Sequence, residues 1–330
     1  MTTYPMKPLT LTALVVATMG TPTRTSELAS LSHATEWINS PPLTEKGLQG
    51  KVVLVQFWTY SCINWLRTMP YLRAWAGKYR DKGLVVIGVH SPEFGFEKQL
   101  PNVRWGAKYY RVDYPIAVDN DFGIWRGFSN QYWPALYLFD GKGEVRYHHF
   151  GEGGYEESER MIQKLLAEAG AAGITKDLAS VVPMGLEEQA DWADSRSPET
   201  YVGTDRGENR VSSPAKLRLN QWAMGGDWTV GRQAAVLDKA DGRITYRFHA
   251  RDLNLVMAPG AGGKPVRFRL LIDGQPPGPA HGIDVDEQGN GTVAEPRMYQ
   301  LIRQPGSVAD RQFEIQFLDP GVEVFVFTFG

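Results

Sequence analysis

The sequence predicts a layered α/β domain with a mixed sheet, followed by an all-β sandwich that we expect to be a jelly roll. Three observations lead to this prediction. Between residues 51 and 172, short apolar runs alternate with stretches of helical periodicity. After residue 198 the helical period nearly disappears, and apolar residues alternate with polar ones. The length of 330 residues also suits about two domains of roughly 150 residues each.

The elements of the first half follow from their hydrophobic patterns. Val52–Trp58 (VVLVQFW) and Leu84–His90 (LVVIGVH) are continuous apolar runs, as expected for buried central strands. Ile63–Tyr79 carries an apolar stripe with helical spacing. The pattern further predicts helices at 102–110, 119–128 and 155–169, a strand at 114–118, and a β-hairpin formed by 135–140 and 144–150. This order of elements is typical of a layered domain with a mixed sheet.

The second half begins after a change in composition. Residues 173–198 are small, polar and acidic, and we expect them to form a linker or extended bridge. Beyond it, residues 243–251, 313–317 and 322–329 alternate with period two, and Gly/Pro-rich breaks separate such segments. About ten short strands of this kind are expected in the C-terminal part. We therefore place the sandwich domain at residues 199–330.

The composition excludes several classes of function. Lys+Arg 35 against Asp+Glu 37 leaves a net charge of -2, which provides no electrostatic footprint for nucleic acid or an anionic membrane. The one cysteine excludes a disulfide framework, a Cys-based zinc cluster and a two-cysteine redox pair within one chain. The six histidines have no metal-ligand spacing, and no phosphate-binding loop or dinucleotide motif occurs. We expect neither a metal nor a cofactor.

The N-terminal segment predicts export. Residues 6–20 (MKPLTLTALVVATMG) form an apolar run after one lysine, too short for a membrane span, which needs ~20 apolar residues. They fit a signal peptide over residues 1–20. We therefore expect a periplasmic or otherwise exported protein that does not span the membrane when mature. The alternative is an N-terminal tail on a cytoplasmic protein.

Cys62 is the residue to which the sequence assigns chemistry. It follows the predicted strand Val52–Trp58 closely, at the point where the predicted helix begins. We expect the thiol in the first helical turn, where free N–H groups and the helix dipole favour an anion. Such a position lowers the pKa of a cysteine and makes it nucleophilic at neutral pH. The alternative is an inert, buried small hydrophobe.

The segment VVLVQFWTYSCINWLRTMPYL resembles the active-site region of the thioredoxin superfamily. A strand ends in Phe-Trp, a cysteine opens a helix, and Pro70 matches the kink proline of that helix. Trp133-Pro134, followed by ALYLFDGKGEVRYHHF, is similar to the superfamily's cis-proline loop. Longer segments, among them DNDFGIWRGFSNQYWPALYLFD and ITYRFHARDLNLV, resemble the soluble C-terminal part of TlpA/DipZ-like thiol:disulfide interchange proteins. The resemblance implies a thioredoxin-like domain at 33–172 and a carbohydrate-binding-module-like domain at 199–330.

The resemblance also implies roles for residues around the thiol. Cys62 would be the nucleophile, Pro134 would lie against it, and Trp133 would pair through its backbone with a bound polypeptide. The family has a second, resolving cysteine where this sequence has Trp65, and usually a buried acid where it has Gln56. An amide cannot accept a proton as a carboxylate does. The resolving thiol and its proton acceptor are therefore both absent, and we expect Trp65 to pack on the helix face.

One thiol restricts the mechanism. Thiol–disulfide exchange runs through a mixed disulfide between the attacking thiolate and its substrate. With no second cysteine in the chain, release of that mixed disulfide needs an external thiol. We therefore predict monothiol exchange with protein thiols or disulfides, supported by an external reductant or small thiol.

Two other functions fit one cysteine. Thr59-Tyr60-Ser61-Cys62 has the T-x-x-C spacing of peroxiredoxins, whose thiolate is oxidised to a sulfenic acid. In that case Arg67 or Arg126 would stabilise the thiolate. The third function is a redox-inactive scaffold that binds a protein or a glycan. Its candidate sugar-stacking rings are Trp222, Trp228 and Tyr299.

Overall fold

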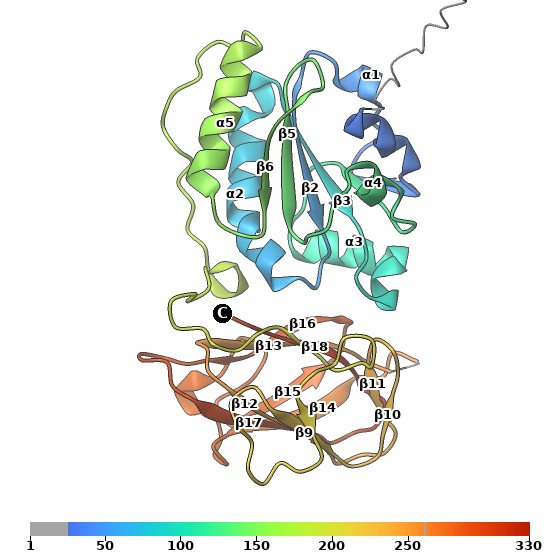
Figure 1. The fold of residues 1–330 in the computed structure, drawn as a ribbon, viewed down its shortest axis with the longest axis vertical. Helices are drawn as coiled ribbons and strands as arrows, with labels where there is room; N and C mark the ends of the chain where they lie inside the picture. Colours follow the sequence, from blue (N-terminus) through green and yellow to red (C-terminus); the bar gives the residue numbers. More distant parts are fainter. Residues whose placement is uncertain (1–25, 261) are drawn as a thin grey trace, which may run out of the picture.

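A helix-covered sheet lies above a sandwich of two further sheets (Figure 1). The computed structural model describes residues 26–260 and 262–330. The signal peptide predicted at residues 1–20 lies outside these described residues. Within them, no helix combines the length and the apolar character that crossing a bilayer requires.

The upper sheet is mixed, as predicted. Its strands are β1 (Glu36–Ile38), β2 (Val52–Trp58), β3 (Leu84–His90), β4 (Ile116–Val118), β5 (Ala135–Phe139) and β6 (Val145–Phe150). They lie in the order β1-β4-β3-β2-β5-β6. The central strands β2, β3 and β4 are parallel, whereas β1, β5 and β6 run antiparallel to their neighbours. Cys62 follows shortly after the end of β2, which is a central strand of this sheet.

Helices cover both faces of this sheet. They are α1 (Glu45–Leu48), α2 (Ile63–Tyr79), α3 (Leu100–Tyr109), α4 (Gly123–Gly127) and α5 (Tyr155–Glu168), with the 3-10 helices η1 (Glu27–His33), η2 (Arg80–Lys82) and η3 (Gly95–Lys98). Val52 and Leu54 of β2 pack with α2, α3 and α5, and the alternate residues Val53 and Val55 pack with η1, α1 and α4. Burial on both faces explains why the strand reads as a continuous apolar run.

Two elements are shorter than predicted. The helix expected at 119–128 begins only at Gly123, because Asp119 acts before it as a cap. Its carboxylate accepts hydrogen bonds from the backbone N–H groups of Ile124 and Trp125, both at 2.9 Å. The strand expected at 114–118 is reduced to Ile116–Val118, following Pro115, which has no N–H to donate to a ladder.

The C-terminal half is a β-sandwich, as predicted, and its described residues form the strands β7 to β18, slightly more than the ten or so expected. Its strands are β7 (Thr200–Tyr201), β8 (Arg210–Val211), β9 (Trp222–Gly225), β10 (Trp228–Val230), β11 (Ala235–Leu237), β12 (Gly242–Phe248), β13 (Asp252–Ala258), β14 (Val266–Ile272), β15 (Asn290–Val293), β16 (Arg297–Arg303), β17 (Arg311–Phe317) and β18 (Glu323–Phe329). Two short 3-10 helices, η4 (Gly185–Glu187) and η5 (Gly278–Ala280), accompany them. One sheet, which we call the interface sheet, has the order β10-β11-β18-β13-β16, with β7 beside β18.

The other sheet of the sandwich has the order β15-β14-β17-β12-β9-β8. Of the strands from β11 to β18, β11, β13, β16 and β18 lie in the interface sheet and β12, β14, β15 and β17 lie in the other, so the chain crosses repeatedly between the two sheets. The strand predicted at 243–251 ends earlier, at Phe248, because the chain turns there into β13 of the interface sheet.

The outer face of the interface sheet packs against the α/β domain (Figure 1). Apolar side chains of β13, β16 and β18 belong to the same hydrophobic cluster as α2 and α3. The ring of Phe325 lies 5.0 Å from Phe94 and 4.8 Å from Phe96, measured between ring centroids. The interface sheet is therefore buried on both faces, and β13 has no exposed residue.

The segment between the two halves is also anchored. The buried carboxylate of Glu159 on α5 accepts hydrogen bonds from Trp75 Nε1 at 2.9 Å, Lys78 Nζ at 2.8 Å and Tyr79 Oη at 2.6 Å. It also accepts the backbone N–H of Ala179 at 2.9 Å. One acid thereby joins α2, α5 and the start of the connecting segment. Although burial alone would raise it, these donors leave the pKa of Glu159 below its usual value.

We predict that Glu159→Gln lowers the free energy of unfolding by about 1–3 kcal/mol at pH 7, because an amide opposes some of the buried donors. The depressed pKa means that this contribution is present above the ordinary carboxyl pKa and is lost as pH falls through the folded value. Urea unfolding at pH 7 and below pH 4 measures the difference. Glu157→Gln, on the exposed side of the same helix, is the matched control and should change stability by less than about 0.5 kcal/mol. Equal effects of the two variants at pH 7 would contradict the assignment.

Candidate functional site

Cys62 lies at the N-cap of α2, at the start of the helix as predicted. Its backbone N–H donates to the carbonyl of Thr59 at 3.2 Å, and its carbonyl accepts the N–H of Leu66 at 3.1 Å. Its side chain makes no capping hydrogen bond and is partly exposed. Pro70 lies inside α2, as the resemblance implies. The thiol therefore projects from the start of the helix next to the open N–H groups.

The Trp133–Pro134 loop faces this thiol. The peptide bond between the two residues is cis, as the resemblance implies. The Cys62 thiol points at the carbonyl oxygen of Trp133, with 4.0 Å between Sγ and O. The indole N–H of Trp133 donates to the carbonyl of Ser91 at 3.0 Å, and its ring lies 4.4 Å from that of Trp125. These contacts hold the loop against the end of β3 and against α4.

Trp65 and Gln56 are bonded to each other. Trp65 is fully buried, and its ring stacks on Trp58 at 4.2 Å between centroids. Its indole N–H donates to Gln56 Oε1 at 3.1 Å, and Gln56 Nε2 donates to Thr68 Oγ1 at 2.9 Å. The Thr68 hydroxyl proton is already used, since it donates to the carbonyl of Trp65 at 2.7 Å. The structure therefore gives Trp65 the packing role expected of it, and Trp65, Gln56 and Thr68 form one hydrogen-bonded unit.

The pKa of Cys62 is shifted upward, opposite to the direction expected from its position at the helix start. Burial raises the pKa of the Cys62 thiol, and the carboxylates of Glu93 and Glu199 raise it further. The backbone N–H groups of Trp65 and Asn64 act in the lowering direction but do not outweigh burial. The prediction of a lowered pKa is wrong for this arrangement because the interface sheet removes water from around the thiol.

A buried acid that the sequence did not indicate binds Ser61, the residue before Cys62. Glu97, in η3, accepts a hydrogen bond from Ser61 Oγ at 2.6 Å. Its other oxygen accepts the backbone N–H groups of Glu93 at 2.7 Å and Phe94 at 2.9 Å. Burial raises the pKa of Glu97 to about 7. No local motif marks this residue, because it reaches Ser61 from a 3-10 turn far along the chain.

A narrow crevice opens next to Cys62 between the two domains. Its volume is about 150 Å³. The α/β side contributes Cys62 and Glu93, the connecting segment contributes Trp192 and Glu199, and β18 contributes Thr328. We call this space the Cys62 crevice.

The residues proposed for the other functions are placed elsewhere. Arg67 is buried and pairs with Glu152 at 3.2 Å, and Arg126 is exposed on α4, so neither is a thiolate partner of Cys62. The sugar-stacking interpretation is wrong for Trp222 and Tyr299, because their rings are 1% and 0% exposed. Trp228 is partly exposed, with its ring 5.8 Å from that of Phe317.

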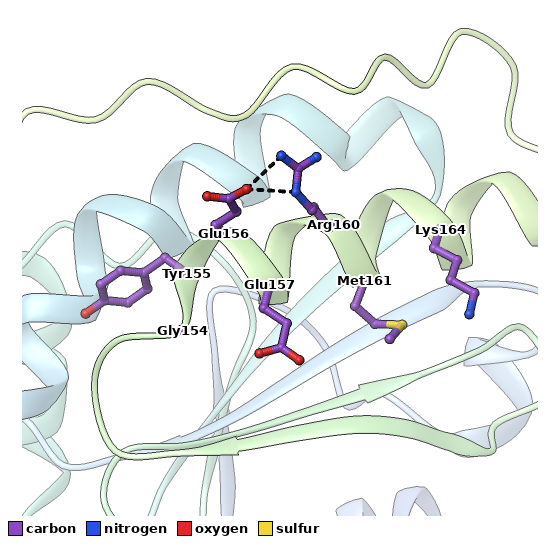
Figure 2. A pocket seen from close by; sticks show the side chains of 7 residues that line it. All are labelled: Gly154, Tyr155, Glu156, Glu157, Arg160, Met161 and Lys164. Carbon is purple, nitrogen blue, oxygen red and sulfur yellow. Dashed lines mark hydrogen bonds and ion pairs between the residues drawn. The ribbon is translucent and has the colours of Figure 1, made fainter.

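A wide surface hollow lies away from the thiol. It measures about 630 Å³ and lies along α5, as Figure 2 shows. Tyr155, Met161 and Lys164 line it, and a surface ion pair joins Glu156 to Arg160 across one helical turn. It holds none of the residues predicted for the site, and its charges are ordinary i,i+4 partners of an exposed helix.

Comparison with known proteins shows which family the chain resembles. A family model described as "Thioredoxin like C-terminal domain" matches residues 197–330. The chain is 36% identical over 316 residues to the protein DipZ of Mycobacterium bovis and of Mycobacterium tuberculosis. These alignments cover 91% of this chain and 42% of DipZ, so the chain spans less than half the length of these relatives.

A shorter relative is matched almost completely. The thiol-disulfide oxidoreductase YkuV of Bacillus subtilis is 30% identical over 141 residues, which cover 43% of this chain and 95% of YkuV. Among solved structures, a thioredoxin-like protein in its oxidized form is 30% identical, with a TM-score of 0.40, over 44% of this chain and 98% of that chain. The match to nearly the whole of YkuV shows that the chain belongs to the thioredoxin superfamily, as a DipZ-like relative of thiol-disulfide oxidoreductases.

Proposed function

We propose that this protein carries out thiol–disulfide exchange through Cys62 alone, by forming a mixed disulfide that an external thiol releases. The observation that carries the proposal is the position of the only cysteine in the sequence, at the start of α2 and against the Trp133 carbonyl of the cis-proline loop. The position of a resolving thiol is taken by Trp65, which is buried and bonded to Gln56. A second thiol from outside must therefore complete each cycle.

The substrates in this proposal are protein thiols or disulfides, with Trp133 pairing through its backbone with the bound polypeptide. Because the interface sheet covers Cys62, such a substrate reaches the thiol only after the two domains separate locally. We place the reaction in the cell envelope, on the basis of the apolar segment at residues 6–20, whose composition suits export. No cofactor takes part, because electrons pass between sulfur atoms.

A redox-inactive binding scaffold is the second candidate, and one observation favours it. The raised pKa keeps the Cys62 thiol protonated at neutral pH in the closed arrangement, and a thiol attacks far more slowly than a thiolate. Reactivity of Cys62 after the interface is loosened therefore distinguishes the two functions.

We expect negligible reduction of insulin disulfides by the protein with a dithiol-dependent reductase alone, and measurable reduction once a small monothiol is added. Insulin turbidity measures the reaction. Cys62→Ser should abolish the part that depends on the protein, because it removes the only sulfur nucleophile. Sustained turnover without the added monothiol would contradict a one-thiol mechanism.

Restoring both departures should restore dithiol chemistry. Trp65→Cys with Gln56→Asp places a second thiol one helical turn from Cys62 and an acid behind it, and should give insulin reduction without added monothiol. The variant also loses a stacked, buried indole, which we expect to lower stability by about 3–5 kcal/mol. Trp65→Ser with Gln56→Asp leaves the same cavity without the thiol and is the matched control. Equal activity of the two folded double variants would show that the pair was not restored.

Loosening the interface should expose the thiol. Phe325→Ala removes the ring that contacts Phe94 and Phe96, so we expect at least a tenfold faster alkylation of Cys62 at pH 7, which corresponds to ~1.4 kcal/mol of docking free energy. The rate with iodoacetamide, followed by mass spectrometry, measures this. Leu318→Ala, a partly exposed residue just after β17, is the control. No acceleration in Phe325→Ala, with the fold intact, would favour the inactive scaffold.

A further inference from the structure

The Cys62 crevice has the dimensions of a site for a small molecule. Its volume of about 150 Å³ is large enough for a small organic molecule. The contact of Phe325 with Phe94 and Phe96 keeps the two domains packed together. A disulfide of two-carbon thiols presents only a few non-hydrogen atoms on each side of its sulfur–sulfur bond.

The lining of the crevice is negatively charged. Glu93 and Glu199 line it, and none of the lining residues is a lysine or an arginine. Glu93 is partly compensated, because Arg206 Nη1 lies 2.8 Å from its Oε1. The Tyr201 hydroxyl lies 2.9 Å from Glu199 Oε2 and 2.7 Å from Glu93 Oε1, so its one proton serves one carboxylate at a time. Burial raises the pKa of Glu199, Arg206 acts in the lowering direction, and no ion pair of the Glu199 side chain is found in the described part of the chain. The crevice therefore carries excess negative charge at the rim, next to the sulfur.

A buried polar group in the wall lacks a partner. Thr328 lines the crevice and is 7% exposed, and its hydroxyl has no hydrogen-bond partner among the described residues. Asn254 stands opposite Thr328 in the register of β13 and β18, and both atoms of its buried amide are likewise unpartnered there. Buried polar groups are hydrogen-bonded in nearly all folded proteins, so an unpartnered set beside a cavity points to a polar occupant.

We propose that the Cys62 crevice admits small aminothiols and their disulfides, with the ammonium group at Glu199 and the sulfur at Cys62. This inference rests on the proposed function, since it requires Cys62 to react by exchange. The thiolate of Cys62 attacks one sulfur of the disulfide, and the sulfur–sulfur bond breaks. One half stays on Cys62 as a mixed disulfide, and the other leaves as a thiolate that takes up the proton released by Cys62. Cys62 is oxidised, and the departing half is reduced.

Three disulfides of matched length test the charge preference. Cystamine is a dication, bis(2-hydroxyethyl) disulfide is neutral, and 3,3′-dithiodipropionate is a dianion. The rate at which each modifies Cys62 in the full chain is followed by intact mass. Each rate is divided by the rate for the same disulfide on the chain unfolded in urea, which removes differences in leaving-group chemistry. We expect the normalised rate for cystamine to exceed that for dithiodipropionate at least tenfold, with the neutral disulfide between them.

Glu199→Gln keeps the shape of the rim and removes its charge, so the preference should fall to less than threefold. Glu157→Gln, an exposed acid on α5, is the matched control and should leave it unchanged. Equal normalised rates for the three disulfides, or a preference that survives Glu199→Gln, would overturn the inference. So would modification by any of them only in Phe325→Ala, because the closed crevice then admits none.

The same experiment separates this inference from the proposed function. If mixed disulfides form but their normalised rates do not follow the charge of the disulfide, the aminothiol site is contradicted and monothiol exchange is not. If no disulfide modifies Cys62 even in Phe325→Ala, the exchange function itself fails.

Discussion

The packing of the interface sheet on the α/β domain determines the state of Cys62. Free N–H groups at a helix start favour a thiolate by about 0.3–1 kcal/mol, up to ~2 in favourable geometry. Removing a charge from water costs several kcal/mol, so burial prevails and the pKa of the thiol rises. The contact of Phe325 with Phe94 and Phe96 is therefore part of the chemistry of the site, because it helps to hold the two domains together. Separation of the domains would return Cys62 to the environment in which its helix position acts alone.

Trp65 and Gln56 depend on each other through their hydrogen bonds. The hydroxyl of Thr68 donates to the carbonyl of Trp65, so the residue at position 56 must donate to Thr68 and also accept from the indole. An ionised carboxylate accepts at both oxygens and donates at neither. Glutamine meets both demands, whereas an acid would have to stay protonated. The hydrogen bonds of the Gln56 amide therefore explain why a glutamine stands at this position, without reference to catalysis.

Most of the α/β domain followed from sequence, and the site did so only in part. Val52–Trp58 and Leu84–His90 were predictable to the residue, because strands buried on both faces have a continuous apolar pattern. The short α4 was not, since its start depends on a cap from Asp119. The position of Cys62 at the helix start was predictable, but its acidity was not, because that depends on strands more than 190 residues away that cover it. Trp222 and Tyr299 were misjudged for the same reason: an aromatic residue on a strand has two faces to choose from, and only the packed structure decides.

If Cys62 acts as proposed, two kinds of partner react with it at rates that different steps limit while the interface is closed. A polypeptide disulfide must wait for the domains to separate, so its rate scales with the docking equilibrium. A small disulfide reacts inside the crevice, where the thiolate fraction of Cys62 limits the rate. The adducts differ as well, because a polypeptide on Cys62 prevents the interface sheet from docking again, whereas an adduct that fits about 150 Å³ does not. Since the chain has no second thiol to remove either adduct, the interface sheet selects which of them persists, and a small aminothiol adduct is the one that closure retains.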